Sequence, residues 1–478
     1  MTEKKEERVS IAEGVLREAA PVAEILPPRK MTEDEEREHQ EERRRRRQHH
    51  THYHHHSSSH HHSRRRRRHH SSSSDSRKLK SLKKWIKKNK KQILGVTLTV
   101  TICLGSVLAG AMWDNYLHQK KAAEDPSVGI TQGQLQIAVS VYDAPVTIVN
   151  SAAAAHMEAA PGTNVHDTYS RYNGKEVRLD VGASVNLRYD LMGAPAGYKV
   201  EKSVFTVVED LAHDAGKQYI PAAGKTDVDV INLKSNTRYT YWVTVTFTNG
   251  VETSVHGAFT TADGPRLLAV DGVYNLRDIG GYKTLDGKRV KQGLLYRGTE
   301  LDGAVESRYT ITDAGKETML SDLKIHTELD LRQPDVSASN DSVLGAGVQH
   351  TYYGAPMYAA IFNESNGEIM RKIFADLAKP ANYPVYLHCT YGQDRTGTVC
   401  YLLGALLGVD QETLVKEYEL SALHHGYVSA EEMNTFVQRL NEMTGATLRN
   451  KAENYLMSIG VTKNEIATIR NFFLENVQ

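Results

Sequence analysis

The spacing of hydrophobic positions divides the chain into four stretches. Residues 1–92 contain almost no aliphatic side chains in their central part, which predicts a tail without a hydrophobic core. Residues 93–113 form an uncharged apolar run that is long enough for one helical span of a bilayer. Residues 125–262 alternate apolar and polar positions in short runs, which predicts strands. Residues 265–478 combine apolar strands with runs at helical spacing, which predicts an α/β domain.

The β-rich stretch is divided into strand-like runs by Gly, Pro, Asn and Asp turns. These runs predict a β-sandwich that is held by its core alone, because the stretch contains no cysteine. Residues 151–160, SAAAAHMEAA, fit neither strand nor turn. The predicted strands are 135–142, 146–150, 177–182, 185–191, 203–209, 227–233 and 238–248.

The C-terminal part is predicted to be helical. Gly408 marks the end of one helix, and residues 462–465 form a capping-box pattern that opens the last one. These helices are expected to cover the sheet and to carry no chemistry.

Residues 384–409 carry the candidate chemistry. Val385 to Leu387 are apolar and β-prone, which predicts a buried strand that ends at His388 and is followed, after a loop, by a helix. The loop contains Cys389, five further residues and then Arg395. A loop that ends at a helix N-terminus directs several backbone N–H groups inward, and together with the helix dipole these groups form an anion site.

The side chains of this loop suit the hydrolysis of a phosphate ester. Arg395 presents a planar fork for two phosphate oxygens. Cys389 would attack phosphorus as the thiolate and form a phosphocysteine. Asp394 would protonate the leaving oxygen and later activate water, and Thr396 would hydrogen-bond the leaving sulfur. The loop residues expected to bind phosphate are Thr390, Tyr391, Gly392, Gln393, Arg395 and Thr396.

These residues also have structural interpretations. A lone cysteine after an apolar strand is commonly a buried small hydrophobe, and an arginine can cap neighbouring carbonyl groups. The complete phrase places His-Cys, five residues and Arg-Thr-Gly between a strand and a helix. Few structural loops need this combination, so the phrase favours the phosphate site.

The phrase HCTYGQDRTG resembles the signature loop of cysteine-dependent protein-tyrosine phosphatases, in particular the bacterial tyrosine/dual-specificity group with HCxxGKDRTG. The resemblance covers about residues 265–478 and implies a mostly parallel central sheet flanked by helices. It also implies that Cys389 is the nucleophile, that Arg395 binds phosphate and that Asp394 is the acid/base. Other phrases that agree in order and spacing are NLRDIGG at 275–281, LYRG at 295–298, LDLR at 329–332, EYELS at 417–421 and IGVT at 459–462.

One loop position departs from that family pattern. The family commonly has Lys where this chain has Gln393. A lysine would attract multiply charged substrates such as phosphoinositides, whereas glutamine donates only neutral hydrogen bonds. The change therefore disfavours a highly anionic lipid or an inositol polyphosphate, but it leaves phosphomonoester hydrolysis intact.

Further candidates follow other predicted strands, where catalytic groups collect in open α/β sheets. Asp330 is a second candidate acid, with a structural carboxylate paired to a nearby arginine as the alternative. Arg297 and Arg332 either line the substrate mouth or form ion pairs at the surface. Asp278 is expected in a turn or an ion pair. Core or surface packing is expected for Tyr352, Tyr353 and Tyr358, with packing against an aromatic substrate as the alternative.

The end of the β-rich stretch resembles the last strands of a fibronectin type III domain. Leu233, Thr237 and Tyr239 occupy positions of its corner and penultimate strand, and residues 259–262 resemble its closing strand. This likeness implies a spacer that holds the enzyme off the membrane, with ligand or cell-wall binding as the alternative.

Charge is distributed unevenly along the chain. The whole chain has 59 Lys and Arg against 58 Asp and Glu, a net charge of +1, but its Arg, His and Ser runs and a Lys-rich segment lie before residue 93. We expect this tail to lie against anionic lipid, and we expect no nucleic acid as partner. Its histidines are irregularly spaced and form no closed site, so we predict no metal and no cofactor.

The flanks of the apolar run predict its orientation. Lysines crowd the N-terminal side of residues 93–113, whereas acidic and basic residues share the other side. The positive-inside rule therefore places the tail in the cytoplasm and everything after Trp113 outside the cell membrane. A signal peptide cleaved near residues 109–111 is the alternative, and the 92-residue lead argues against it.

Cysteine usage predicts no disulfide framework. The chain has three cysteines, of which Cys103 lies in the apolar run and Cys389 in the loop. Cys400, in the predicted helix after the loop, is expected to pack on its apolar side, with a redox partner of Cys389 as the alternative.

The sequence thus predicts a tail (1–92), a transmembrane helix (93–113), a β-sandwich (125–262) and a catalytic domain (265–478). This membrane-anchored enzyme would hydrolyse phosphomonoesters, foremost protein phosphotyrosine, through a phosphocysteine. A catalytically inactive phosphate-binding surface receptor and a phosphatase for small-molecule, lipid or polymer phosphate esters are the alternatives. A rhodanese-like sulfur carrier also uses a loop cysteine, but Asp394 beside the Arg-Thr-Gly phrase favours phosphate chemistry.

Overall fold

The computed structural model describes residues 136–175, 178–192, 198–210, 215–336 and 341–477. The predicted tail and the predicted transmembrane helix, residues 1–113, lie outside these ranges. Among the residues that are described, no helix combines the length and the apolar character needed to cross a bilayer.

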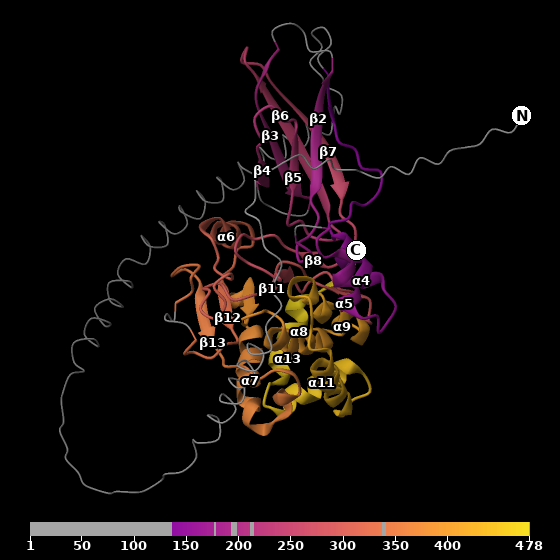
Figure 1. Ribbon diagram of the computed structural model, residues 1–478, viewed down its shortest axis with the longest axis vertical. Helices are drawn as coiled ribbons and strands as arrows, with labels where there is room; N and C mark the ends of the chain where they lie inside the picture. Colours follow the sequence, from indigo (N-terminus) through magenta and orange to yellow (C-terminus); the bar gives the residue numbers. More distant parts are fainter. Residues whose placement is uncertain (1–135, 176–177, 193–197, 211–214, 337–340, 478) are drawn as a thin grey trace, which may run out of the picture. The chain divides into compact units, whose positions relative to one another are not determined.

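The N-terminal part of the described chain is a β-sandwich of two antiparallel sheets (Figure 1). One sheet has the order β1-β2-β5 and the other has the order β4-β3-β6-β7. Alternate side chains of facing strands fill one core, because successive residues of a strand point to opposite faces. The strands are β1 (Gln136–Val139), β2 (Val185–Met192), β3 (Val200–Glu209), β4 (Lys217–Tyr219), β5 (Asp227–Val230), β6 (Arg238–Phe247) and β7 (Glu252–Thr260).

Two helices connect β1 to β2, in a region where strands were predicted at 146–150 and 177–182 and residues 151–160 fitted neither strand nor turn. These helices are α4 (Ser151–Glu158) and α5 (Val165–Tyr172). The predicted strand 146–150 makes only an isolated bridge to Thr261, and the described residues 178–182 form no strand. Both strand predictions were therefore wrong.

Asn150 explains why the apolar run before it does not continue as a strand. Its side-chain oxygen accepts a hydrogen bond from the Ala153 N–H at 2.8 Å, which caps the first turn of α4. Its amide group donates to the carbonyl oxygens of Leu179 and Val181. One side chain thus starts a helix and holds the end of the same insertion, which we call the β1–β2 insertion (residues 146–182).

The C-terminal part contains a six-stranded sheet with the order β13-β12-β14-β11-β9-β8. The four strands from β13 to β11 are parallel, and β9 and β8 continue the sheet in antiparallel pairs. The strands are β8 (Arg266–Leu267), β9 (Arg277–Asp278), β11 (Leu295–Gly298), β12 (Thr327–Asp330), β13 (Gln349–Tyr352) and β14 (Val385–His388), beside a separate pair of β10 (Lys288–Val290) with β15 (Leu474–Asn476).

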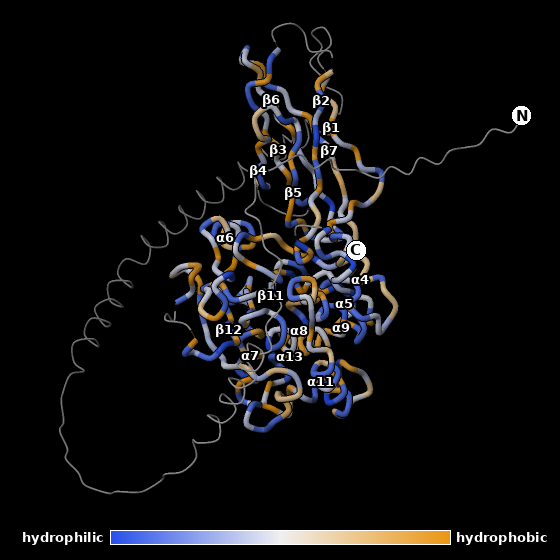
Figure 2. Tube along the Cα trace, in the orientation of Figure 1, coloured by the Kyte–Doolittle hydropathy of each residue, from blue (hydrophilic) through white to orange (hydrophobic). Residues whose placement is uncertain are grey.

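Both faces of this sheet are buried by hydrophobic side chains. Val385 and Leu387 of β14 enter a large core shared with most of the helices, and Tyr386 between them enters a second core on the opposite face. Figure 2 shows hydrophobic stretches in both the sandwich and the sheet-containing part. The helices are α6 (Asp313–Glu317), α7 (Gly367–Leu377), α8 (Asp394–Leu407), α9 (Gln411–Glu419), α10 (Ala422–His425), α11 (Ala430–Glu442), α12 (Leu448–Ser458) and α13 (Lys463–Phe473), with short turns η1 (Thr318–Asp322), η2 (Tyr358–Phe362), η3 (Glu364–Asn366) and η4 (Pro380–Asn382).

The helix boundaries predicted in the C-terminal part are confirmed. Gly408 ends α8 with a left-handed φ of 94°. Thr462 and Glu465 form a reciprocal capping box that opens α13.

Candidate active site

The predicted strand, loop and helix are present at residues 385–407. The strand β14 lies between β12 and β11, so the loop that follows it leaves the middle of the sheet at the carboxyl ends of the strands. Cys389 is the first residue of this loop and only 2% exposed. The helix α8 begins at Asp394, two residues before the predicted start.

The carbonyl groups of the loop point away from its interior. Four consecutive carbonyl oxygens, from Thr390 to Gln393, accept hydrogen bonds from groups outside the loop or from the first turn of α8. The donors are the Glu300 N–H to Thr390 O at 3.0 Å, Asn275 Nδ2 to Tyr391 O at 3.1 Å, Arg297 Nη2 to Gly392 O at 2.8 Å and the Gly397 N–H to Gln393 O at 2.7 Å.

The backbone N–H groups of the loop are free to bind a ligand. Within the described structure, no backbone N–H of residues 390–396 donates a hydrogen bond to another residue. The C=O and N–H of a trans peptide point in opposite directions, so outward carbonyls turn the N–H groups inward. Together with the N-terminus of α8, they form an anion site around Cys389.

Gly392 is required at the tightest point of this loop. Its φ of 63° is left-handed, and a Cβ at this position would lie 2.2 Å from the carbonyl oxygen of Gly298. Any other residue would be strained and would collide with β11.

An ion-pair triad supports the loop from below. Glu417 binds Arg277 Nε through one oxygen and Arg297 Nη1 through the other, both at 2.7 Å. Burial opposes ionisation of Glu417, but the two arginines outweigh it and lower the pKa of this carboxyl group. Arg297 is fully buried and bonds the Gly392 carbonyl, so the interpretation that it lines the substrate mouth was wrong.

Removal of this carboxylate would be costly. We expect Glu417→Gln to lower the free energy of unfolding by about 3–5 kcal/mol, because it leaves two buried arginines without a counter-charge. The lowered pKa means that this stabilisation is present above about pH 4.5 and lost as the pH falls. Chemical denaturation measures the change, and the exposed Glu412→Gln on the same helix should shift it by less than about 1 kcal/mol.

Asp330 and Arg332 form a second buried cluster beside the loop. Both oxygens of Asp330 accept hydrogen bonds from Arg332, which also pairs with Glu300 and Asp302. Both residues are almost fully buried. Asp330 is therefore placed as a structural carboxylate, the alternative given above, and Arg332 does not line the mouth.

His388 connects this cluster to Cys389. Its Nε2 lies 2.8 Å from Glu328 Oε1, and its Nδ1 lies 3.1 Å from the carbonyl oxygen of Cys389. Burial disfavours the charged ring, but Asp330 and Glu328 outweigh burial and raise the pKa of His388 to about 9. A doubly protonated ring donates both hydrogen bonds and so fixes the first peptide of the loop.

The same cluster has a donor set that could hold a metal ion. One ligand atom each from Glu328, Asp330, His350 and His388 lies within 4.8 Å of the other three. The carboxylate oxygens already have protein partners, since Glu328 bonds Ser342 and His388 and Asp330 bonds Arg332. The charges of the group are thus balanced by its own side chains.

Asp394 is held by a pair of tyrosines. The Tyr358 hydroxyl donates to Asp394 Oδ1 and lies 2.7 Å from the Tyr418 hydroxyl. Gln393 Nε2 also donates to Asp394 Oδ1, at 3.1 Å. Tyr358 has a left-handed φ of 52°, and its N–H donates to Thr398 Oγ1 at 2.8 Å. Such strain persists only where the surroundings enforce it, and it is common at functional sites.

We expect Tyr358→Phe to lower kcat about tenfold, because the hydrogen bond that orients Asp394 is lost. Tyr418→Phe leaves the Tyr358–Asp394 bond in place and is the matched control, with a smaller effect. Steady-state kinetics and melting temperature measure both variants. An equal loss in both would show that the hydroxyl pair acts through packing rather than through Asp394.

The remaining predicted loop residues lie together at the site. Arg395 is half-buried, and its Nη1 lies 3.4 Å from the Leu331 carbonyl oxygen. Thr396 is buried, and its hydroxyl has no hydrogen-bond partner among the described residues. The side chain of Tyr391 is 38% exposed beside Tyr309, and Gln393 is buried.

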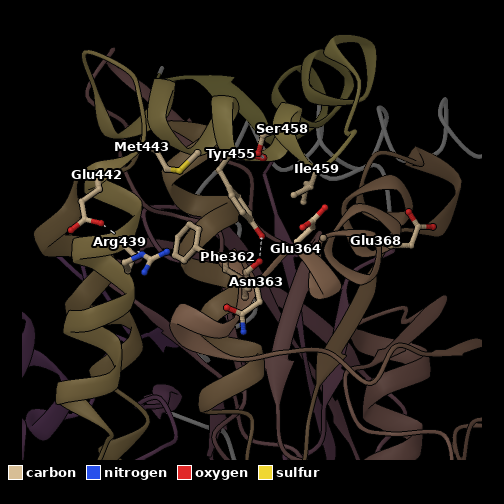
Figure 3. A pocket seen from close by; sticks show the side chains of 12 residues that line it. Phe362, Asn363, Glu364, Glu368, Arg439, Glu442, Met443, Tyr455, Ser458 and Ile459 are labelled. Atoms are coloured by element: carbon tan, nitrogen blue, oxygen red, sulfur yellow. Dashed lines mark hydrogen bonds and ion pairs between the residues drawn. The ribbon is translucent and has the colours of Figure 1, made fainter. Parts of the chain in front are cut away.

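A separate cavity of about 460 Å³ lies between η2, α11 and α12 (Figure 3). Phe362, Arg439 and Tyr455 line it with other side chains, and none of residues 388–396 does. It is therefore not the mouth of the phosphate loop.

Comparison with known proteins finds a family match in the C-terminal part of the chain. Residues 268–475 match the sequence pattern described as the tyrosine phosphatase family. This match supports the phosphatase family for that part of the chain. We call it the phosphatase segment (residues 268–475).

Two curated relatives agree with this match. A Cupriavidus necator protein, named provisionally as a tyrosine-protein phosphatase, is 27% identical over 187 residues, which are 34% of this chain and 65% of that protein. The Nostoc commune tyrosine-protein phosphatase is 24% identical over 210 residues, which are 34% of this chain and 69% of that protein. The chain thus spans about two thirds of their lengths. With the family match, they support a cysteine-phosphatase-like α/β domain and a hydrolase that acts on phosphate esters.

One solved structure is also similar. The core catalytic domain of the PP-IP phosphatase SIW14 from S. cerevisiae, in complex with citrate, covers 34% of this chain and 80% of that chain at 16% identity. Its TM-score is 0.20, which does not establish a shared fold.

Proposed function

We propose that this protein hydrolyses phosphomonoesters, foremost phosphotyrosine in proteins, through a phosphocysteine on Cys389. The observation that carries the proposal is the loop itself, whose carbonyls are bound outward while its N–H groups surround the cysteine. Preorganised donors of this kind stabilise the charge that develops on a transferring phosphoryl group.

The first half-reaction transfers the phosphoryl group to the enzyme. The Cys389 thiolate attacks phosphorus and forms the S–P bond as the P–O bond to the leaving group breaks. Asp394 gives its proton to the leaving oxygen. Arg395 and the loop N–H groups bind the phosphoryl oxygens throughout.

The second half-reaction returns the enzyme to its starting state. Asp394 removes a proton from water, the resulting hydroxyl attacks phosphorus and the S–P bond breaks. Inorganic phosphate leaves, and the thiolate of Cys389 is restored. The hydroxyl of Thr396, buried without a described partner, is available to donate to the departing sulfur.

Three features support phosphotyrosine over other esters. Cys389 is buried at the bottom of the loop, so the phosphate of a substrate must extend well beyond its backbone, as an aromatic ester does. Tyr391, which is 38% exposed, offers a ring contact near the loop. Gln393 adds no positive charge for a polyanion.

The wider organisation is part of the proposal. We propose a single membrane span with the basic tail in the cytoplasm near anionic lipid and the phosphatase segment outside the cell. The sandwich is proposed to be fibronectin type III-like. Its strand order supports this, because strands 1, 2 and 5 form one sheet and strands 4, 3, 6 and 7 form the other.

Turnover by the full chain tests the activity. Under reducing conditions, we expect hydrolysis of a phosphotyrosine peptide to exceed that of a phosphoserine peptide and a phosphoinositide. Turnover led by the phosphoinositide would overturn the substrate preference. No turnover of any ester, with vanadate or phosphate still bound, would indicate a phosphate-binding receptor instead.

The full chain is used because the β1–β2 insertion covers an apolar cluster of the phosphatase segment. Leu420 and Leu423 pack in one cluster with Val149, Ala152 and Leu179 of the β1–β2 insertion. A fragment that starts at residue 265 would expose this apolar surface.

A further inference from the structure

We propose that Asp180, in the β1–β2 insertion, is a positioning residue for the catalytic loop. This inference rests on the proposed phosphatase function and extends it to a residue outside the phosphatase segment. Its basis is a set of hydrogen bonds and ion pairs that leads from Asp180 by two routes to the same loop carbonyl, Tyr391 O.

The β1–β2 insertion is docked firmly on the phosphatase segment. Its apolar residues share a buried cluster with Leu267, Leu420 and Leu423. Lys416 Nζ donates to the carbonyl oxygens of Met157 and Ala159 at 3.0 and 2.7 Å. These contacts fix the position of the insertion, and therefore of Asp180, relative to the catalytic loop.

Asp180 is itself tightly held. It is 4% exposed, and its two oxygens accept hydrogen bonds from Arg178 at 2.9 and 2.8 Å. Arg178 also donates to the carbonyl oxygen of Val273 and stacks over the Tyr274 ring at 4.4 Å. Burial disfavours the charged carboxylate, but His424 and Arg178 outweigh burial and lower its pKa.

The first route passes through Asn275. The backbone N–H of Asn275 donates to Asp180 Oδ2 at 2.7 Å, and its side-chain Nδ2 donates to Tyr391 O at 3.1 Å. Asn275 has a left-handed φ of 51°, a conformation that asparagine tolerates better than most residues. Asp180 thus fixes the backbone of Asn275, and the side chain of Asn275 in turn binds the loop carbonyl of Tyr391.

The second route passes through two histidines of α10. His424 Nδ1 lies 3.4 Å from Asp180 Oδ2, and its ring packs edge-on against His425 at 4.5 Å. His425 Nε2 lies 2.9 Å from Tyr391 O. Burial and the neighbouring His424 lower the pKa of His425 to about 3, so this ring is neutral at physiological pH. Because Tyr391 O can only accept, Nε2 must carry the ring hydrogen and donate it.

The carbonyl where both routes end controls a catalytic donor. Tyr391 O belongs to the same planar peptide as the N–H of Gly392, which points in the opposite direction. Two donors that pull this oxygen outward therefore aim the Gly392 N–H into the anion site. A small rotation of this peptide would misdirect the donor, and misplacement by about 1 Å can cost 100-fold in rate.

The test compares two aspartates of the full chain with the same local chemistry. Asp190 pairs with Arg188 two residues before it, as Asp180 pairs with Arg178, but the Asp190 side chain is 54% exposed in β2 and its described side-chain partner is Arg188 alone. Asp180→Asn removes the charge that orders both routes. Asp190→Asn is the matched control. The readouts are kcat and KM for a phosphotyrosine peptide, the Kd of vanadate and the melting temperature.

We expect Asp180→Asn to lower kcat by about 10- to 100-fold and to weaken vanadate binding by about tenfold, while Asp190→Asn leaves both within about twofold. A lower melting temperature with unchanged kcat and vanadate affinity would overturn the proposal, because it would mean that Asp180 only stabilises the docked insertion. If the wild type hydrolyses no ester, the proposed function fails, yet vanadate affinity still decides whether Asp180 positions the loop.

A second variant covers the case in which Asp180→Asn does not fold. His425→Ala interrupts the second route at its last step and leaves the pairing of Asp180 with Arg178 and Asn275 in place. Weaker vanadate binding by this variant at unchanged melting temperature supports the proposal. Unchanged vanadate binding would overturn the second route, because the Asn275 bond to Tyr391 O remains in this variant.

Discussion

Cys389→Ser is expected to abolish turnover, by a factor on the order of 10⁴ or more, while the loop still binds oxyanions. The hydroxyl of serine is a far weaker nucleophile than a thiolate. The N–H groups of residues 390–396 and Arg395 are untouched by the change, so the anion site should persist. Turnover of a phosphotyrosine peptide and calorimetric binding of vanadate measure the two effects on one preparation.

Cys400→Ala is the matched control for this prediction. Cys400 lies buried in α8, where burial raises the pKa of its thiol to about 12 and keeps it protonated. Its replacement should leave turnover within about threefold, since it removes no group of the loop. Activity that survives in Cys389→Ser but is lost in Cys400→Ala would contradict the assignment of the nucleophile.

Asp394→Asn is expected to lower turnover of phosphotyrosine peptides by about 10²- to 10⁴-fold, the range for a general acid or base. Asparagine can still accept the hydrogen bond from Tyr358, but it can neither give nor take the catalytic proton. Vanadate affinity should stay near the wild-type value. Asp313→Asn is a suitable control, because Asp313 is also the first residue of a helix but is fully exposed.

A change of the leaving group separates the acid role of Asp394 from its base role. Nitrophenolate departs without protonation, so the loss in the first step should shrink when a nitrophenyl phosphate replaces the peptide. The second step still needs a base, so the phosphocysteine should accumulate. An equal defect in phosphoenzyme formation with both substrates would show that Asp394 is not the acid.

The loop and its flanking elements were predictable because their signals are local. The apolar strand 385–388, the glycine in the loop and the helix behind it follow one another in sequence, and all appear in the structure. The ion pair expected for Asp278 is also confirmed. Its partner is Arg266 on the neighbouring strand β8, at 2.8 Å.

The support beneath the loop was not predictable from spacing. A buried and an exposed arginine look alike in sequence, so Arg297 and Arg332 were expected at a substrate mouth or in surface ion pairs, whereas the structure places both in buried ion pairs. Tyr358 had no signal beyond its type, because its contact with Asp394 joins residues that are 36 positions apart. Only tertiary packing distinguishes these roles.

The β1–β2 insertion was missed for a different reason. Its apolar residues before Asn150 have strand character, but the asparagine caps a helix instead, and tertiary contacts override the local preference. Its partners Leu420 and Leu423 lie more than 200 residues away in the chain. No pattern within the insertion indicates that it completes the core beneath the catalytic loop.

The most direct test of the central claim is to trap the phosphoryl group on the enzyme. The full chain is mixed with a phosphotyrosine peptide, quenched within milliseconds and examined by peptide mass spectrometry. A second sample combines Asp394→Asn with a nitrophenyl phosphate, because this combination favours accumulation of the phosphocysteine. The account predicts a phosphoryl group on Cys389 that is absent from Cys389→Ser. Hydrolysis that proceeds with Cys389 never modified, and that continues in Cys389→Ser, would contradict it.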